Sequence, residues 1–246
     1  MGKLIALSYS PWSEKARWAL DHHGIDYVEQ AHTPMIGELA LRAALKRWTG
    51  KVSGPAYVGD DGEGVRDSFE IAQYAEKHGN GKSSTLFPKD VMERIGAWNA
   101  LSEQALVAGR ALRMPRIAES PEALRESLPR FARELGPVGG AMGKIGIAFI
   151  ARKYDVDAAH EEASRAAIRA VLSTTKAALS EDRSYLVEQF SFADIAMACV
   201  LQMVVPVDDR FIRLGPATRK VWTDEKLAGE FPDLVAWRDR LYQTYR

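Results

Sequence analysis

The spacing of apolar residues changes once along the chain, near residue 80, and this change constrains the fold more than any other feature. Before it, short apolar runs such as Leu4 to Leu7 alternate with stretches of helical spacing. After it, strand signals nearly vanish. The polar cluster from Asn80 to Thr85 separates the two parts and is the best linker candidate. We therefore expect an α/β domain over residues 1–80, a linker over 81–88 and an all-α domain over 89–246.

The first part predicts a mixed sheet. A strand at 4–7, a helix at 11–23 and a strand at 25–30 form a βαβ unit, whose two strands run parallel. A helix over 35–48 follows, and then two short strands at 56–58 and 65–66 flank a Gly-Asp-Asp-Gly turn. A closing helix starts at Ser68 and reaches about His78. Five stretches of the second part have helical spacing, namely 89–112, 121–153, 157–179, 191–205 and 232–242.

The composition argues against several classes of function. The 33 Lys and Arg residues balance the 33 Asp and Glu residues, so no net field attracts nucleic acid or an anionic membrane. The single cysteine, Cys199, allows no intramolecular disulfide and suits a reducing compartment, so we expect a cytoplasmic protein. The five histidines lack metal-ligand spacing, so we expect them on the surface and expect no metal. No P-loop, GxGxxG or GxSxG motif occurs, which disfavours nucleotide cofactors and hydrolase chemistry.

The most apolar stretch, residues 136–151, contains Lys144 and five glycines and is shorter than the roughly 20 residues that span a membrane. Its glycines indicate instead a helix that approaches another backbone closely.

One junction between a strand and a helix suits an anion. Ser10 and Pro11 follow the first strand and open the first helix, whose free N–H groups and positive dipole end favour a thiolate. The dipole contributes about 1 kcal/mol, which lowers a thiol pKa by about 0.7 unit, so a hydroxyl that donates to the sulfur must supply the rest. By itself, however, the segment is more simply an ordinary helix start with Ser10 as the N-cap.

The run SPWSEKARWAL at 10–20, followed by Gly24, resembles the opening of cytosolic glutathione transferases. It is most similar to serine-type members and to the omega-, tau- and zeta-like classes. The resemblance implies a thioredoxin-like domain that binds glutathione and a helical domain that carries the electrophile subsite. Ser10 and Ser13 stand where the related glutaredoxin motif has cysteines, so thiol-disulfide exchange is not expected. Ser10 is the expected catalytic hydroxyl, Ser13 the alternate donor and Tyr9 a third option.

Two further motifs match this family. The resemblance implies a cis proline at Gly54-Pro55 whose backbone pairs with the cysteinyl part of glutathione, and an Asp67-Ser68 pair that holds the γ-glutamyl end. Alternatively, Asp67-Ser68 is a plain helix cap. The family usually has Lys-Val-Pro where this chain has KVSGP at 51–55, which leaves the register of Lys51 open. The expected glutathione-binding residues are Pro11, Trp12, Lys51, Gly54, Pro55, Asp67 and Ser68.

In the second part, Ser191 and Asp194 resemble the family's N-capping box, with Phe190 packing on Ile195 as a hydrophobic staple. Residues 231–237 also resemble the start of the family's last long helix. Apolar residues at helical spacing mostly form the core, but the electrophile subsite is expected among them. The candidates are the Trp12 region together with Trp98, Leu101, Ala105, Leu112 and Met114.

These features predict a glutathione transferase, with glutathione as co-substrate and no covalently bound cofactor. The resemblance also implies a homodimer, with no nucleic-acid or membrane partner. Two alternatives stay open: a non-catalytic protein of the same fold that binds glutathione or a partner, and a glutathione-dependent peroxidase or isomerase that uses the same site.

Overall fold

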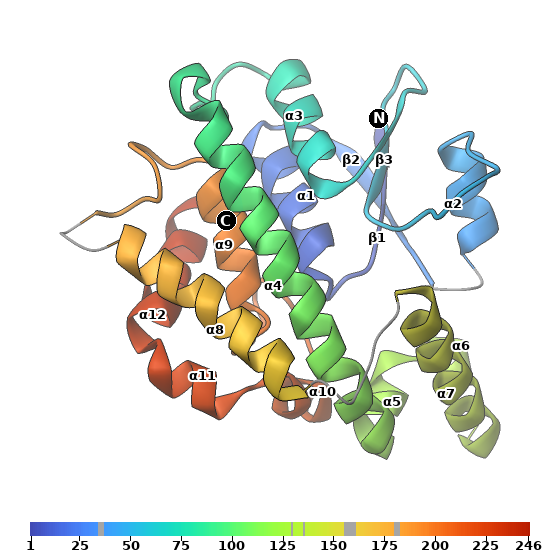
Figure 1. Ribbon diagram of the computed structural model, residues 1–246. Helices are drawn as coiled ribbons and strands as arrows, with labels where there is room; N and C mark the ends of the chain where they lie inside the picture. Colours follow the sequence, from blue (N-terminus) through green and yellow to red (C-terminus); the bar gives the residue numbers. More distant parts are fainter. Residues whose placement is uncertain (34–36, 129, 135, 155–160, 180–182) are drawn as a thin grey trace.

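The N-terminal part of the chain is a four-stranded sheet with helices on both faces (Figure 1). The computed structural model describes residues 1–33, 37–128, 130–134, 136–154, 161–179 and 183–246. The strands lie in the order β2-β1-β3-β4, with β1 parallel to β2 and the other pairs antiparallel. Their bounds are β1 (Gly2–Ala6), β2 (Tyr27–Ala31), β3 (Ala56–Val58) and β4 (Gly64–Arg66). The βαβ unit and the hairpin expected from the sequence are confirmed.

Strand β1 divides its side chains between two layers, as the two-residue period of a strand requires. Leu4 and Ala6 belong to the core that includes α1 (Pro11–His22) and α3 (Ser68–His78). Ile5 points the other way and packs with Leu41 of α2 (Glu38–Ala44). Helix α2 ends at Ala44, earlier than the expected Trp48, and the expected start at residue 35 lies outside the described residues.

After residue 88, helices joined by turns and loops make up the described residues, and none of these residues forms a strand, which confirms the expected all-α domain. After a 3-10 turn (Lys89–Val91), the long helix α4 (Met92–Glu119) crosses the molecule and packs along α8 (Glu161–Ala178) (Figure 1). Helix α4 continues through Pro115, beyond the expected end at residue 112. The stretch 121–153 divides into α5 (Pro121–Ser127), α6 (Arg130–Arg133) and α7 (Gly136–Lys153).

The remaining helices are α9 (Phe192–Leu201), α10 (Pro216–Trp222), α11 (Glu225–Glu230) and α12 (Pro232–Tyr245). Helices α10 and α11 were not expected, because 7 and 6 residues are too few to display a helical period.

The capping box at the start of α9 is confirmed. The Asp194 carboxylate accepts hydrogen bonds from the backbone N–H groups of Ser191 and Leu186, each over 2.9 Å, and Ser191 Oγ accepts from Ala193 N–H over 3.3 Å. Phe190 and Ile195 both lie in the main core. The box fixes the entry to a helix whose residues are all buried.

Close approach of the glycine-rich helix α7 is confirmed at two positions. A Cβ atom on Gly139 would lie 2.1 Å from the carbonyl oxygen of Ala132, and one on Gly143 would lie 3.0 Å from the Leu124 side chain. Gly140 and Gly146 face open space. The first two glycines therefore let α7 lie against α5 and α6, beside the cavity described next.

Candidate active site

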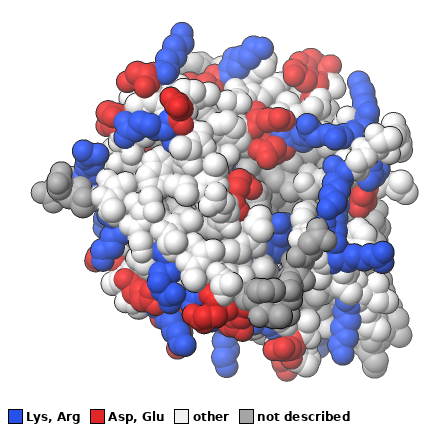
Figure 2. Space-filling model, viewed as in Figure 1, with Lys and Arg blue, Asp and Glu red and all other residues white. Residues whose placement is uncertain are grey.

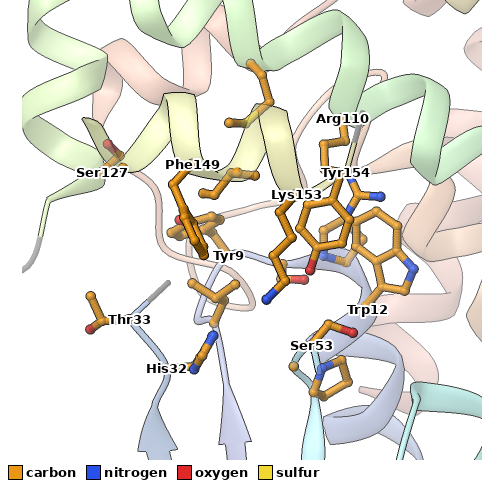
Figure 3. Close-up of a pocket in the computed structure, with 18 of the residues that line it drawn as sticks. Tyr9, Trp12, His32, Thr33, Ser53, Arg110, Ser127, Phe149, Lys153 and Tyr154 are labelled. Carbon is orange, nitrogen blue, oxygen red and sulfur yellow. The ribbon is translucent and has the colours of Figure 1, made fainter. Parts of the chain in front are cut away.

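A cavity of about 610 Å³ opens between the sheet domain and helices α4 and α7 (Figure 3). The carboxyl end of β2, the loop before β3 and the first residues of α1 and α3 form one wall. Helices α4 and α7 and the end of α10 form the other. The cavity brings together every glutathione-binding residue expected from the sequence: Pro11, Trp12, Lys51, Gly54, Pro55, Asp67 and Ser68, together with Ser10.

Ser10 lies at the junction of β1 and α1 as the N-cap of the helix. Its side chain is 7% exposed, and its Oγ accepts only a long hydrogen bond, 3.5 Å, from Ser13 N–H. The hydroxyl donates to no described residue. Its hydrogen can therefore be directed at a ligand atom in the cavity.

Ser13 does not fit the role of alternate donor. Its side chain is fully buried, its Oγ accepts the Leu7 N–H over 3.1 Å, and it is not part of the cavity wall. One turn into the helix, the side chain points back along the chain toward β1 rather than into the cavity. Tyr9 does line the cavity, and burial raises the pKa of its phenol, so the phenol stays protonated at neutral pH.

The loop before β3 presents its backbone to the cavity. The Gly54–Pro55 peptide bond is cis, and a Cβ on Gly54 would lie 3.5 Å from the Ile5 carbonyl oxygen. Val52 is buried against the α2 side of the sheet. Lys51 lines the cavity, where its Nζ donates to the Lys153 carbonyl over 3.2 Å. The lysine thereby ties this loop to the end of α7.

The start of α3 combines backbone strain with an unsatisfied hydroxyl. Asp67 has a left-handed φ of 72°, which is strained for a residue with a side chain, and its carboxylate accepts the Phe69 N–H over 2.7 Å. The next residue, Ser68, is 1% exposed, and its Oγ has no partner among the described residues. Buried hydroxyls without a partner are rare in native proteins, so Ser68 is a candidate for binding a ligand.

Most of the expected electrophile residues lie elsewhere. Met114 and Trp12 line the cavity, whereas Ala105 and Leu112 are core residues and Trp98 and Leu101 pack against the core. Helix α4 is rotated about its axis so that a stripe of side chains next to the expected one faces the cavity. The lining residues of that stripe are Glu103, Val107, Arg110, Arg113, Met114 and Ile117.

Sequence reasoning missed several lining residues. The expectation of surface histidines is wrong for His23 and His32, which are buried. His32 follows β2 and lines the cavity, its Nδ1 has no described partner, and burial lowers its pKa, so the ring is neutral at pH 7. Its position shortly after a predicted strand could have indicated a site residue, but many residues outside a site share such a position.

Helix α7 and the residue after it cover the cavity. Phe149, Lys153 and Tyr154 point into it (Figure 3), and Lys153 Nζ pairs with Glu38 of α2 over 3.2 Å. The Arg110 guanidinium lies 3.8 Å from the ring centroid of Tyr154 and 4.8 Å from that of Trp12. No local pattern marks these residues, because α7 reaches the site only through tertiary packing.

Within the described ranges, no group of three or more His, Cys, Asp or Glu side chains could hold a metal ion. The same residues form no helix that is long and apolar enough to cross a membrane.

Comparisons with known proteins agree with this architecture. Residues 9–78 match the glutathione S-transferase N-terminal domain, and residues 141–244 match the glutathione S-transferase C-terminal domain. The comparison with curated proteins finds no match.

Among solved structures, a glutathione transferase from Phanerochaete chrysosporium is 14% identical, with a TM-score of 0.66 over 100% of this chain and 97% of that one. A family member from Pseudomonas fluorescens Pf-5 with bound glutathione is 21% identical, with a TM-score of 0.59 over 99% and 95%. A glutathione S-transferase from Methylobacillus flagellatus with bound glutathione is 19% identical, with the same TM-score and coverage. At these identities the structural likeness shows the fold, while the two domain matches show descent. By both of its domains, the chain belongs to the glutathione S-transferase family.

Proposed function

We propose that this protein is a serine-type glutathione transferase, in which glutathione extends from Ser68 past the cis Gly54–Pro55 loop to Ser10. The buried Ser68 hydroxyl carries the proposal, because it lies in the cavity wall with no partner among the described residues. An acceptor on a bound ligand would complete its hydrogen bonding.

The start of α3 suits the γ-glutamyl end of glutathione. The helix N-terminus and Ser68 favour its carboxylate, and the Asp67 carboxylate favours its ammonium group. The backbone of the cavity-lining Gly54–Pro55 segment suits the cysteinyl peptide unit. Bound glutathione in the relatives from Pseudomonas fluorescens Pf-5 and Methylobacillus flagellatus supports this ligand.

Ser10 is the proposed thiolate-stabilising residue. The glutathione thiol releases its proton to solvent, and the thiolate then accepts a hydrogen bond from Ser10 Oγ near the positive end of α1. The thiolate forms a carbon–sulfur bond with the electrophile, which expels its leaving group with the bonding electron pair. Glutathione, the electrophile and a second copy of the chain in a cytoplasmic homodimer are the proposed partners.

Calorimetry with glutathione and a thiolate-absorbance titration of the complex test this function. We expect binding with a depressed thiol pKa, and we expect Ser10→Ala to raise that pKa by about 1–2 units, since hydrogen bonds to charged groups contribute about 1.5–3 kcal/mol. Ser13→Ala is the matched control and should leave the thiol pKa unchanged, because Ser13 faces Leu7.

No binding at millimolar glutathione would overturn the proposed function. Binding with an unshifted thiol pKa would instead favour the non-catalytic alternative. A pKa that stays depressed in Ser10→Ala would assign the stabilisation to another donor.

A further inference from the structure

Two residues of the cavity wall each have a buried N–H group without an acceptor in the described part of the chain. The two groups are Arg113 Nε on α4 and Trp222 Nε1 at the end of α10, and neither donates a hydrogen bond to a described residue. The side chains are 2% and 5% exposed, so the bulk solvent does not satisfy these groups. Because buried donors are nearly always paired, two of them in one cavity wall indicate a ligand with an acceptor.

Arg113 is held rigidly in place. Its Nη1 donates to the Gly109 carbonyl and its Nη2 to the Trp222 carbonyl, each over 3.0 Å. Its guanidinium carbon lies 5.4 Å from the centroid of the Trp222 ring. Both unpaired donors thus belong to one preorganised arrangement, which reduces the entropic cost of binding a ligand there.

The Arg113 charge has no counter-ion among the described residues. The Asp224 charge favours the Arg113 cation, but Asp224 is paired elsewhere: its Oδ2 lies 3.1 Å from Arg165 Nε and 3.6 Å from Arg116 Nη2. Burial, with the nearby Arg116 charge, lowers the pKa of Arg113 to about 9, so the side chain remains charged at neutral pH. A buried charge without a partner is unfavourable, and a bound anion would offset that penalty.

Arg110 adds a second positive charge one helical turn away. Its guanidinium stacks on Tyr154 and Trp12 (Figure 3) and makes no hydrogen bond or ion pair with the described part of the chain. The carboxylate of Glu103 on the same helix is already engaged, since it accepts from Lys15 Nζ over 2.8 Å and from Trp12 Nε1 over 2.6 Å. Lys and Arg side chains also gather on the side of α2 and α7 in Figure 2.

Apolar side chains from two helices also line the cavity. They are Val107, Met114 and Ile117 of α4, and Phe149 and Ile150 of α7. A ligand that fits must therefore combine an anionic group with an apolar body.

We propose that the electrophile subsite takes an apolar organic acid, whose carboxylate binds Arg113 Nε and Trp222 Nε1 with Arg110 beside it. This inference rests on the proposed function, because it names the class of the second substrate. Arg113 and Trp222 are specificity-determining residues that position the acid while the glutathione sulfur lies near Ser10.

Calorimetry on the glutathione-loaded protein tests the subsite. The probes are 4-phenylbutanoate and benzoate, each compared with its neutral amide. We expect at least one acid to bind about 10- to 100-fold more tightly than its amide, the range of a charge-assisted hydrogen bond. Arg113→Met should abolish this preference while leaving the glutathione Kd unchanged.

Trp222→Phe is a second test that remains informative if the Arg113 variant does not fold, since it removes the Nε1 donor and keeps an aromatic ring. It should reduce the preference for the acid severalfold. Arg169→Met is the matched control on α8, where Arg169 pairs with Glu230 outside the cavity wall, and it should keep the full preference.

Equal binding of acid and amide, no binding of either acid at millimolar concentration, or a preference that persists in both cavity variants would overturn the inference. Glutathione binding in the same experiments separates the two proposals. If glutathione binds and the acids are not preferred, only the acid subsite is wrong. If glutathione does not bind, the proposed function is wrong.

Discussion

Trp12 Nε1 donates a hydrogen bond to Glu103 Oε2 across 2.6 Å and so joins the start of α1 to α4 at the edge of the cavity. The other carboxylate oxygen accepts from Lys15 Nζ over 2.8 Å. Lys15 is fully buried, and Ser102 Oγ lies 2.7 Å from the same ammonium group. One carboxylate on the helical domain thus orients a cavity-lining ring and neutralises a buried cation of the sheet domain.

Glu103→Gln should destabilise the protein by about 2 kcal/mol or more, because it leaves the buried Lys15 ammonium without a counter-charge. The carboxylate is 34% exposed, which keeps the expected loss below that of a fully buried pair. Urea denaturation measures the change, and combining Glu103→Gln with Lys15→Met should recover part of it. Glu188→Gln, which breaks an exposed pair with Arg94, is the control and should change stability by less than about 1 kcal/mol. If Glu103→Gln and Glu188→Gln changed the free energy of unfolding equally, Glu103 would not be the counter-charge that stabilises Lys15.

Ser68→Ala should weaken glutathione binding about 10-fold while leaving the free energy of unfolding unchanged or slightly higher. The two readouts differ because the buried hydroxyl lacks a partner in the described structure but is proposed to bind the ligand. Calorimetry and chemical denaturation of the same variant test both effects. Ser102→Ala should lower the free energy of unfolding and leave the glutathione affinity unchanged, since Ser102 Oγ contacts Lys15 and Ser102 does not line the cavity. A Ser68 variant that loses stability but keeps its affinity would show a purely structural role.

Gly139→Ala should destabilise the protein by about 2 kcal/mol or more, because the added Cβ would lie 2.1 Å from the Ala132 carbonyl oxygen. Gly140→Ala, one residue along α7, should instead gain about 0.5–1 kcal/mol, since nothing lies within 4 Å and alanine favours a helix. Thermal unfolding of both variants measures the contrast. Similar shifts of the unfolding temperature would mean that α7 does not rest on α6 in solution.

Asp194 should make stability fall as the pH rises from about 4 to 7. Burial raises the pKa of its carboxyl to about 7, well above the roughly 3.9 of an unfolded chain. The folded state therefore holds this proton more tightly, so the contribution is fully present below pH ~4 and is lost as the pH rises through the folded pKa.

The test compares the wild type with Asp194→Asn by chemical denaturation from pH 4 to 8, because all other carboxyls are common to both proteins. The wild type should lose stability relative to the variant as the pH rises. A pH-independent difference for Asp194→Asn would mean that its hydrogen bonds from Ser191 and Leu186 offset the effect of burial.

Local signals in the sequence determined the elements of this fold. The Ser10-Pro11 helix start, the Ser191 and Asp194 capping box and the βαβ order are each set by a few neighbouring residues, and all three are present in the structure. Local chemistry decides these features because caps and turns satisfy the backbone hydrogen bonds of their own segment. The motifs expected to bind glutathione also follow strand ends or open helices, and the topology of the sheet brings them to one cavity.

Only the tertiary structure decided which side chains complete that cavity. Ala105 and Met114 lie on the same helix, yet one is core and the other lines the site, because the packing of α4 against the sheet domain and α8 sets its rotation. Arg113 and Trp222 are 109 residues apart, and neither has a local pattern that marks it. Periodicity identifies the apolar side of a helix. Which of its side chains face a cavity depends on how the helix packs against segments that are distant in the sequence. The arrangement of donors that selects a ligand is therefore fixed by packing.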